Sequence, residues 1–183
     1  MALIYTTRFL EDSRAIFRQY KSLAEGAMSQ VSDEEFFRPL DSESNSIALV
    51  VKHMAGNMRS RWTDFLMSDG EKPWRDRDSE FEDRRDLSRA QLLELWEAGW
   101  KLALSTLESL TDADLERTIT IRGEKHSVLQ AINRQIAHYA YHAGQIVFLS
   151  KHFRSTQWKT LSIARNKSGD FSRQVARGEL NQR

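Results

Sequence analysis

The sequence predicts an all-α fold: a four-helix bundle with a long crossover between helices 2 and 3 and a small β-hairpin before helix 4. Three observations lead to this prediction. Apolar residues recur at three- and four-residue steps over four segments of about 20–25 residues each, which is typical of amphipathic helices. Only two prolines and eight glycines interrupt the chain. A stretch dense in both signs of charge separates the second segment from the third, as expected of a crossover.

The first two helices are predicted at about 6–30 and 47–66, where the apolar stripes are continuous. A short turn is expected at 32–37, followed by a polar segment. Asn45 or Ser46 is a suitable N-cap for the second helix, because a short polar side chain can accept a hydrogen bond from a free backbone N–H.

The charged stretch at 68–87 is predicted to be a long exposed connection. Ser88 and Gln91 then have the spacing of a capping box, so the third helix is expected to begin here and to continue to about Leu110.

The segment TITIRGEKH predicts a short β-hairpin that turns near Gly123. Ser127 is expected to cap the fourth helix, at about 128–151. A single domain is expected over 1–183, with the bundle at about 6–151 and a basic tail at 154–183 that packs in part. The apolar residues expected to pack the tail on the bundle are Trp158, Leu161 and Ile163.

Composition excludes several kinds of site and partner. Without cysteine, metal ligands must be histidine, carboxylate or water. The net charge of +1 favours neither nucleic acid nor an anionic membrane. Charged residues come too early for a signal peptide, and no apolar window reaches the roughly 20 residues of a membrane span. We therefore expect a cytoplasmic protein with no nucleic-acid or membrane partner. Only the basic tail suggests a nucleic-acid partner, and its charge can instead balance the acidic stretch at 76–86.

Three histidines form the candidate site. His138 and His142 are one helical turn apart in HYAYHAGQ, so they share a helix face and can bind one metal ion. His53 lies on the apolar face of the second helix, and a bundle core is a known place for metal sites built from facing helices. Two alternatives stay open: an HxxxH pair that occurs by chance, and a His53 that is an ordinary hydrogen-bonded core residue.

Several better-defined motifs are missing. Tyr139 follows His138, so the pair is not the HExxH of zinc proteases, and no Glu-x-x-His suggests a di-iron centre. Haem is disfavoured, because histidines one turn apart cannot bind opposite faces of one haem iron. His152 is about 15 Å along the helix from His142, too far to join the site. His126 is expected to be an exposed hairpin residue.

The chain resembles the DinB-like superfamily of metal-binding four-helix bundles, which includes YfiT-like metal-dependent hydrolases. The resemblance extends over most of the chain and is closest to a branch classed only as a domain of unknown function. The segments that carry it are NSIALVVKHMAGNMRSRWTDFL, DGEKPWRDRDSEFED, HSVLQAINRQIAHYAYHAGQIVFLSK and WKTLSIARNKS.

This resemblance implies one divalent metal ion, zinc or nickel, held by His53, His138 and His142. It also implies a homodimer and a small-molecule substrate, with low-molecular-weight-thiol S-transferase or hydrolase chemistry. The alternative is a non-catalytic, metal-binding dimeric scaffold or sensor, which a protein group in the fourth coordination position would favour.

Three polar residues near these histidines are candidates for binding substrate or orienting the imidazoles: Asn57, Arg61 and Gln145. Arg61 can equally form an ordinary surface or interhelical ion pair. The sequence identifies no general base.

Overall fold

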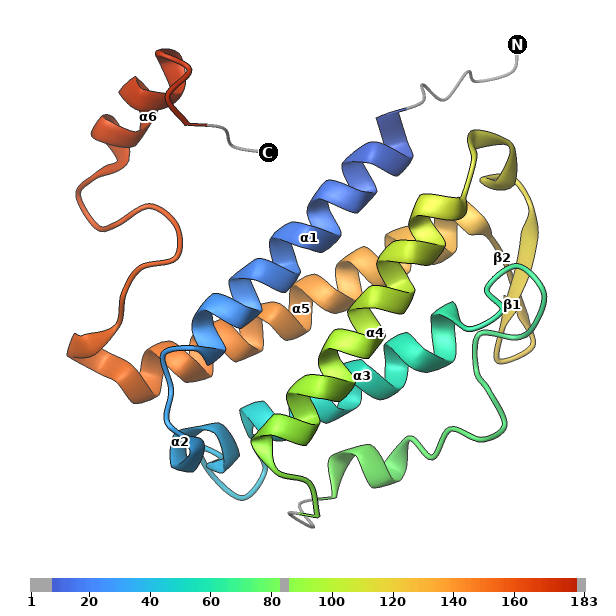
Figure 1. The fold of residues 1–183 in the computed structure, drawn as a ribbon, viewed down its shortest axis with the longest axis horizontal. Coiled ribbons are helices and arrows are strands. Elements are labelled where there is room, and N and C mark those ends of the chain that lie inside the picture. The colour runs from blue at the N-terminus through green and yellow to red at the C-terminus, as the bar shows by residue number, and fades with distance from the viewer. Residues whose placement is uncertain (1–7, 83–85, 181–183) are drawn as a thin grey trace.

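Four long helices, α1, α3, α4 and α5, form a bundle in the computed structural model, which describes residues 8–82 and 86–180 (Figure 1). Helix α3 packs mainly on α4 and α1 on α5, while α3 also contacts α5. The predicted fold class is confirmed. In chain order the elements are α1 (Arg8–Met28), α2 (Asp33–Phe37), α3 (Ile47–Trp62), η1 (Asp78–Phe81), α4 (Arg89–Ser109), η2 (Asp112–Asp114), β1 (Thr118–Ile121), β2 (Glu124–Ser127), α5 (Val128–Arg154), η3 (Ser155–Gln157) and α6 (Ser168–Ala176).

Some predicted elements and boundaries differ from the structure, and α1 ends at Met28, two residues before its predicted end. The turn expected at 32–37 is a short helix, α2, because Ser32 and Glu35 form a capping box and Phe36 is fully buried. Helix α3 ends at Trp62 instead of residue 66, since Thr63 has an extended backbone. The predicted start of the first helix at residue 6 lies outside the described residues.

Serine caps fix the starts of α3, α4 and α5. Ser46, not Asn45, accepts a hydrogen bond from the backbone N–H of Leu49 at the start of α3. Ser88 and Ser127 form capping boxes at the starts of α4 and α5, in agreement with the sequence pattern. Helix α5 continues three residues past its predicted end at 151, to Arg154.

An aromatic cluster joins all four bundle helices. Phe17 of α1 contacts the rings of Trp62 of α3 and Tyr139 of α5 edge-on, at centroid distances of 5.7 and 5.3 Å. Trp100 of α4 lies 5.2 Å from Tyr139. The indole N–H of Trp62 donates to the Tyr139 hydroxyl at 2.8 Å, which satisfies two buried polar groups at once. The four rings, each almost completely buried, therefore hold the helices in register beside His138.

The crossover after α3 is not the fully exposed connection that its charge predicted. Ser60 of α3 donates to the carbonyl of Gly70 and accepts from the backbone N–H of Lys72, at 2.9 and 3.0 Å. Glu80 of η1 is buried, and the Arg75 side chain is only 2% exposed. Ion pairing between charged residues of this segment explains how it packs against the bundle.

The β-hairpin follows its prediction and is held against the crossover. Arg122 and Gly123 form its turn, both with positive φ (56° and 77°), the conformation that favours glycine in two-residue hairpin loops. The Asp69 carboxylate accepts hydrogen bonds from both of their backbone N–H groups, each at 2.8 Å. The N–H of Gly70 also donates to the carbonyl of Thr120 at 2.8 Å. These bonds fix the hairpin turn beside the crossover.

The tail packs only in part. Trp158 and Leu161 contact the core, as expected, but Ile163 is 42% exposed and does not pack as predicted. Helix α6, which the sequence pattern did not indicate, lies outside the four-helix bundle (Figure 1). Among the described residues, no helix has both the length and the apolar character needed to cross a membrane.

Candidate metal centre

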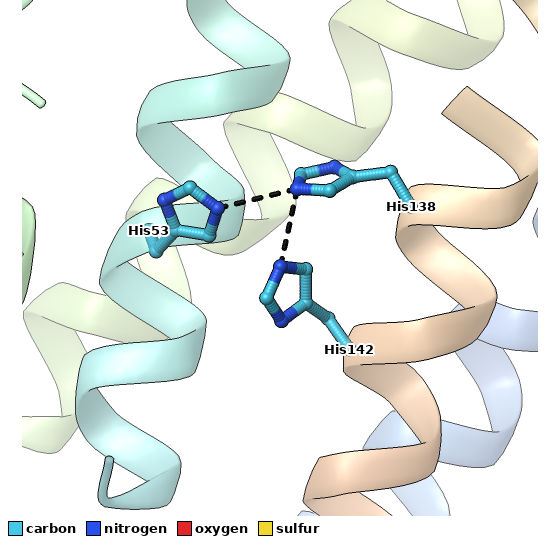
Figure 2. Close-up of side chains that lie close together, drawn as sticks. All are labelled: His53, His138 and His142. Atoms are coloured by element: carbon cyan, nitrogen blue, oxygen red, sulfur yellow. Dashed lines mark hydrogen bonds between the residues drawn. The ribbon is translucent and has the colours of Figure 1, made fainter. Parts of the chain in front are cut away.

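The three predicted histidines meet between α3 and α5 (Figure 2). Nε2 of His138 lies 3.2 Å from Nε2 of His53 and 3.1 Å from Nε2 of His142. The three candidate ligand atoms all lie within 4.8 Å of one another. Two nitrogens bound to one tetrahedral zinc ion at about 2.05 Å would be about 3.3 Å apart. The two measured separations are close to that value.

The His53 and His142 rings are each oriented by a hydrogen bond at Nδ1, so that Nε2 faces the centre. Nδ1 of His53 lies 2.8 Å from Oε2 of Glu80, and Nδ1 of His142 lies 2.7 Å from Oε1 of Gln145. Both oxygens are acceptors, so each Nδ1 carries the proton and each Nε2 presents a lone pair to the centre. Tyr141 supports this arrangement, because its hydroxyl accepts from the Gln145 amide at 3.2 Å.

Helix η1 supplies two contacts to His53. Its Phe81 ring lies 4.6 Å from the imidazole, and its Glu80 carboxylate is held by a bidentate pair with Arg75 at 2.8 and 2.9 Å. Gly56 makes room for this carboxylate: a Cβ at that position would lie 2.2 Å from Oε1 of Glu80. Burial opposes ionisation of Glu80, but its hydrogen bonds with His53 and Arg75 prevail and lower its pKa. It is therefore a carboxylate at neutral pH.

Burial also keeps two of the imidazoles neutral. Removal from water, together with the neighbouring His142 and His53, lowers the pKa of His138 to about 3. For His142, removal from water outweighs the hydrogen bond with Gln145, which raises the pKa, and the resulting pKa is about 4. Neutral imidazole is the form that binds metal. At neutral pH these two side chains need not lose a proton before an ion binds.

A proton cannot satisfy all three inward-facing nitrogens. With Nδ1–H fixed on His53 and His142, His138 can donate its Nε2–H to only one of their lone pairs. Its own Nδ1 is buried and has no hydrogen-bond partner among the described residues. A cation that accepts all three Nε2 lone pairs fits this donor set, and Nδ1 of His138 then carries the proton. Among the described residues, no carboxylate joins the three histidines as a further ligand.

The other predicted site residues have different environments. Gln145 contacts His142. Asn57 contacts no imidazole; its side-chain oxygen lies 3.4 Å from the Tyr139 hydroxyl. Arg61 is buried, so its ion pair with Glu71 at 3.0 Å is not a surface pair, and it connects α3 to the crossover and not to another bundle helix.

The two remaining histidines are not part of the centre. The side chain of His126 is 16% exposed, so it is half-buried and not the exposed residue predicted. His152 is exposed near the end of α5.

A cavity of about 210 Å³ opens beside His53 and His138. Asn57 and the buried Gln135 line it together with arginines from several elements. Of these arginines, only Arg61 was a sequence candidate. Sequence patterns missed the others, Gln135 and Glu80, because nothing in their local sequence distinguishes them from solvated polar residues. The only local signal is that Arg134 and Gln135 precede His138 by four and three residues, which places all three on the same helix face.

Comparisons with known proteins agree with this architecture. A family model described as "Protein of unknown function (DUF1572)" matches residues 5–167. Among solved structures, the chain is similar to YfiT from Bacillus subtilis, described as a probable metal-dependent hydrolase with an unusual four-helix bundle topology. The TM-score is 0.67 at 16% identity, over 87% of this chain and 94% of that chain. At this identity the likeness establishes the fold. No curated protein sequence matches the chain.

Proposed function

The chain belongs to the DUF1572 family, and from this premise we propose that it is a divalent-metal-dependent enzyme acting on a small molecule. His53, His138 and His142 hold the ion, zinc or nickel. The observation that carries the proposal is the convergence of three Nε2 atoms whose lone pairs no arrangement of protons satisfies. The description of YfiT as a probable metal-dependent hydrolase supports the same class of activity.

The proposed reaction is hydrolysis, or transfer of a low-molecular-weight thiol to an electrophile. A divalent ion held by His53, His138 and His142 would supply Lewis acidity and would make a water or thiol nucleophilic at neutral pH. Three protein ligands would leave a coordination position open for that nucleophile or for the substrate.

The protein groups around the ligands have distinct roles in this proposal. Glu80 and Gln145 hold His53 and His142 in the Nδ1–H tautomer and fix the direction of each ring. Phe81 covers one face of His53, and the buried Tyr139 beside His138 excludes water from the core side. The cavity beside His53 and His138 is the route by which substrate reaches the ion.

Metal binding by the purified chain is the first test. Elemental analysis and calorimetric titration with Zn²⁺ and Ni²⁺ are expected to give one ion per chain, and His138→Ala is expected to abolish binding. His126→Ala is a matched control, because it removes a half-buried histidine that is not one of the three. A wild-type protein that binds no ion, or a His138→Ala protein that binds as well as wild type, would contradict the proposal.

Activity is the second test. The metal-loaded protein is assayed against a panel of ester and amide substrates, and against thiols with model electrophiles. Turnover that disappears in His138→Ala and after chelation supports an enzyme. The panel on which turnover is observed then distinguishes a hydrolase from a thiol transferase. Stoichiometric metal without turnover on either panel would instead favour the metal-binding scaffold.

A further inference from the structure

Five arginines surround the cavity beside the histidines, and they come from four different parts of the fold. The end of α3, the crossover, the hairpin turn and the first half of α5 all contribute. The five are Arg61, Arg75, Arg77, Arg122 and Arg134. Like charges repel one another, so their convergence on one small space needs a compensating charge.

Two carboxylates, the buried Glu80 and the half-buried Glu71, neutralise only part of this charge. Glu80 pairs with Arg75, and Glu71 pairs with Arg61, Arg75 and Arg122. Five guanidinium groups against two contacting carboxylates leave an excess of three positive charges. The excess is not spread evenly, because Arg61 and Arg75 are buried in these ion pairs.

The remaining positive charge lies at the rim of the cavity. Arg134 is exposed and makes no hydrogen bond or ion pair within the described part of the chain. Arg77 contacts the Phe81 ring through its guanidinium, 5.0 Å from the centroid, and has no carboxylate partner among the described residues. Arg122 uses only Nε, in its bond to Glu71. We call Arg77, Arg122 and Arg134 the rim arginines.

Buried polar atoms in the same cavity also have no partner. Oε1 of Gln135 and Nε of Arg61 are buried without a hydrogen bond among the described residues, and Gln135 is only 3% exposed. A buried polar group without a partner is costly, so both atoms indicate a ligand that supplies an acceptor and an N–H or O–H donor.

We propose that this cavity binds an oxyanion, the carboxylate or phosphate group of a small-molecule substrate, and places the rest of that molecule beside the three histidines. Guanidinium groups bind both kinds of oxyanion with paired hydrogen bonds. A volume of about 210 Å³ holds about seven waters at liquid density, so it fits the anionic end of a substrate and not a large cofactor. The inference rests on the proposed function, because it assigns the substrate class of the same site.

The test measures anion binding in the metal-free protein, so that it does not depend on the ion or on turnover. Inorganic phosphate and succinate are titrated calorimetrically at low and at high salt. We expect phosphate, succinate or both to bind, and to bind more weakly at high salt. The anion with the higher affinity identifies the class, phosphate or carboxylate. Arg134→Gln and Arg122→Gln are each expected to lower that affinity about tenfold. Arg165→Gln, which removes an exposed arginine of the tail, is expected to leave it unchanged.

Two results would overturn the inference: no binding of either anion at millimolar concentration, or affinity within twofold of wild type in the Arg122→Gln/Arg134→Gln double variant. The metal titration is run on the same proteins and separates the two proposals. Metal binding without anion binding rejects the oxyanion site alone. Anion binding that depends on the rim arginines, without metal binding, rejects the proposed function alone.

Discussion

At the scale of single residues, the site depends on groups that contact the histidine rings at Nδ1, the nitrogen that points away from the centre. Glu80 acts on His53 through Nδ1, and Gly56 acts on Glu80 only by having no side chain. Such contacts fix which nitrogen faces the centre, and a ligand whose ring is free to turn binds metal more weakly.

Two substitutions test the Glu80 contact. Glu80→Gln removes the charge that holds the Nδ1 proton, and Gly56→Ala displaces the carboxylate, because the new Cβ would lie 2.2 Å from Oε1. Each is expected to lower Zn²⁺ affinity about 10–100-fold by calorimetry. Gly144→Ala is the control: it makes the same change in a helix where a Cβ meets no neighbour, so affinity is expected to stay at the wild-type value. Unchanged affinity in both site variants would contradict the role of Glu80.

Burial of His142 and partial burial of His138 also predict a pH dependence of stability in the metal-free protein. Folding lowers the pKa of His138 to about 3 and that of His142 to about 4, from an ordinary value near 6.5. Between about pH 6.5 and 4, the unfolded chain therefore binds more protons than the folded chain, and stability falls as pH falls. Urea unfolding at a series of pH values measures this slope.

A double variant provides the comparison for that slope. His138→Gln/His142→Gln is expected to lose less stability over the same pH range, because glutamine does not titrate. His152→Gln, at an exposed position near the end of α5, is expected to keep the wild-type dependence. Equal slopes in wild type and the double variant would show that the two imidazoles do not contribute.

At the scale of elements, local patterns predicted the helices well and the crossover poorly. Helix periodicity and serine caps are properties of neighbouring residues, so the starts of α3, α4 and α5 could be predicted, as could the histidine pair on α5. The partner of His53 is 27 positions away, in a segment where Glu80 is one of many charged residues. Glu80 is buried because Arg75 pairs with it and because Gly56 leaves room for its carboxylate. Both contacts depend on the three-dimensional fold, so the sequence alone does not indicate them.

The hairpin turn provides a test at the element scale. Asp69 holds the turn through the N–H groups of Arg122 and Gly123, and thereby sets the position of the Arg122 side chain. Asp69→Ala is expected to destabilise the protein by about 1–2 kcal/mol and to weaken oxyanion binding in the metal-free protein. Asp114→Ala removes a carboxylate that caps η2 and does not touch the turn, so it is expected to leave anion affinity unchanged. An Asp69→Ala protein that binds the anion as well as wild type would show that the hairpin turn does not contribute to the oxyanion site.

At the scale of the whole molecule, the centre joins two parts of the bundle. α3 contributes His53 and packs mainly on α4, whereas α5 contributes His138 and His142 and packs mainly on α1. Beside the site, the aromatic cluster of Phe17, Trp62, Trp100 and Tyr139 already connects all four helices. An ion bound between α3 and α5 would add a second connection across the same interface, and it would bind the folded state alone.

Metal binding is therefore expected to stabilise the whole bundle. At a free Zn²⁺ concentration about 100 times the Kd, linkage adds about 2.7 kcal/mol, which corresponds to a rise in Tm of about 5–10 °C for a chain of this size. Differential scanning calorimetry with Zn²⁺ and with excess chelator measures the shift. The His53→Ala/His138→Ala/His142→Ala variant is expected to show none. A similar shift in that variant would locate the stabilising ion elsewhere, and no shift in the wild type would mean that the folded bundle has no preference for the ion over the unfolded chain.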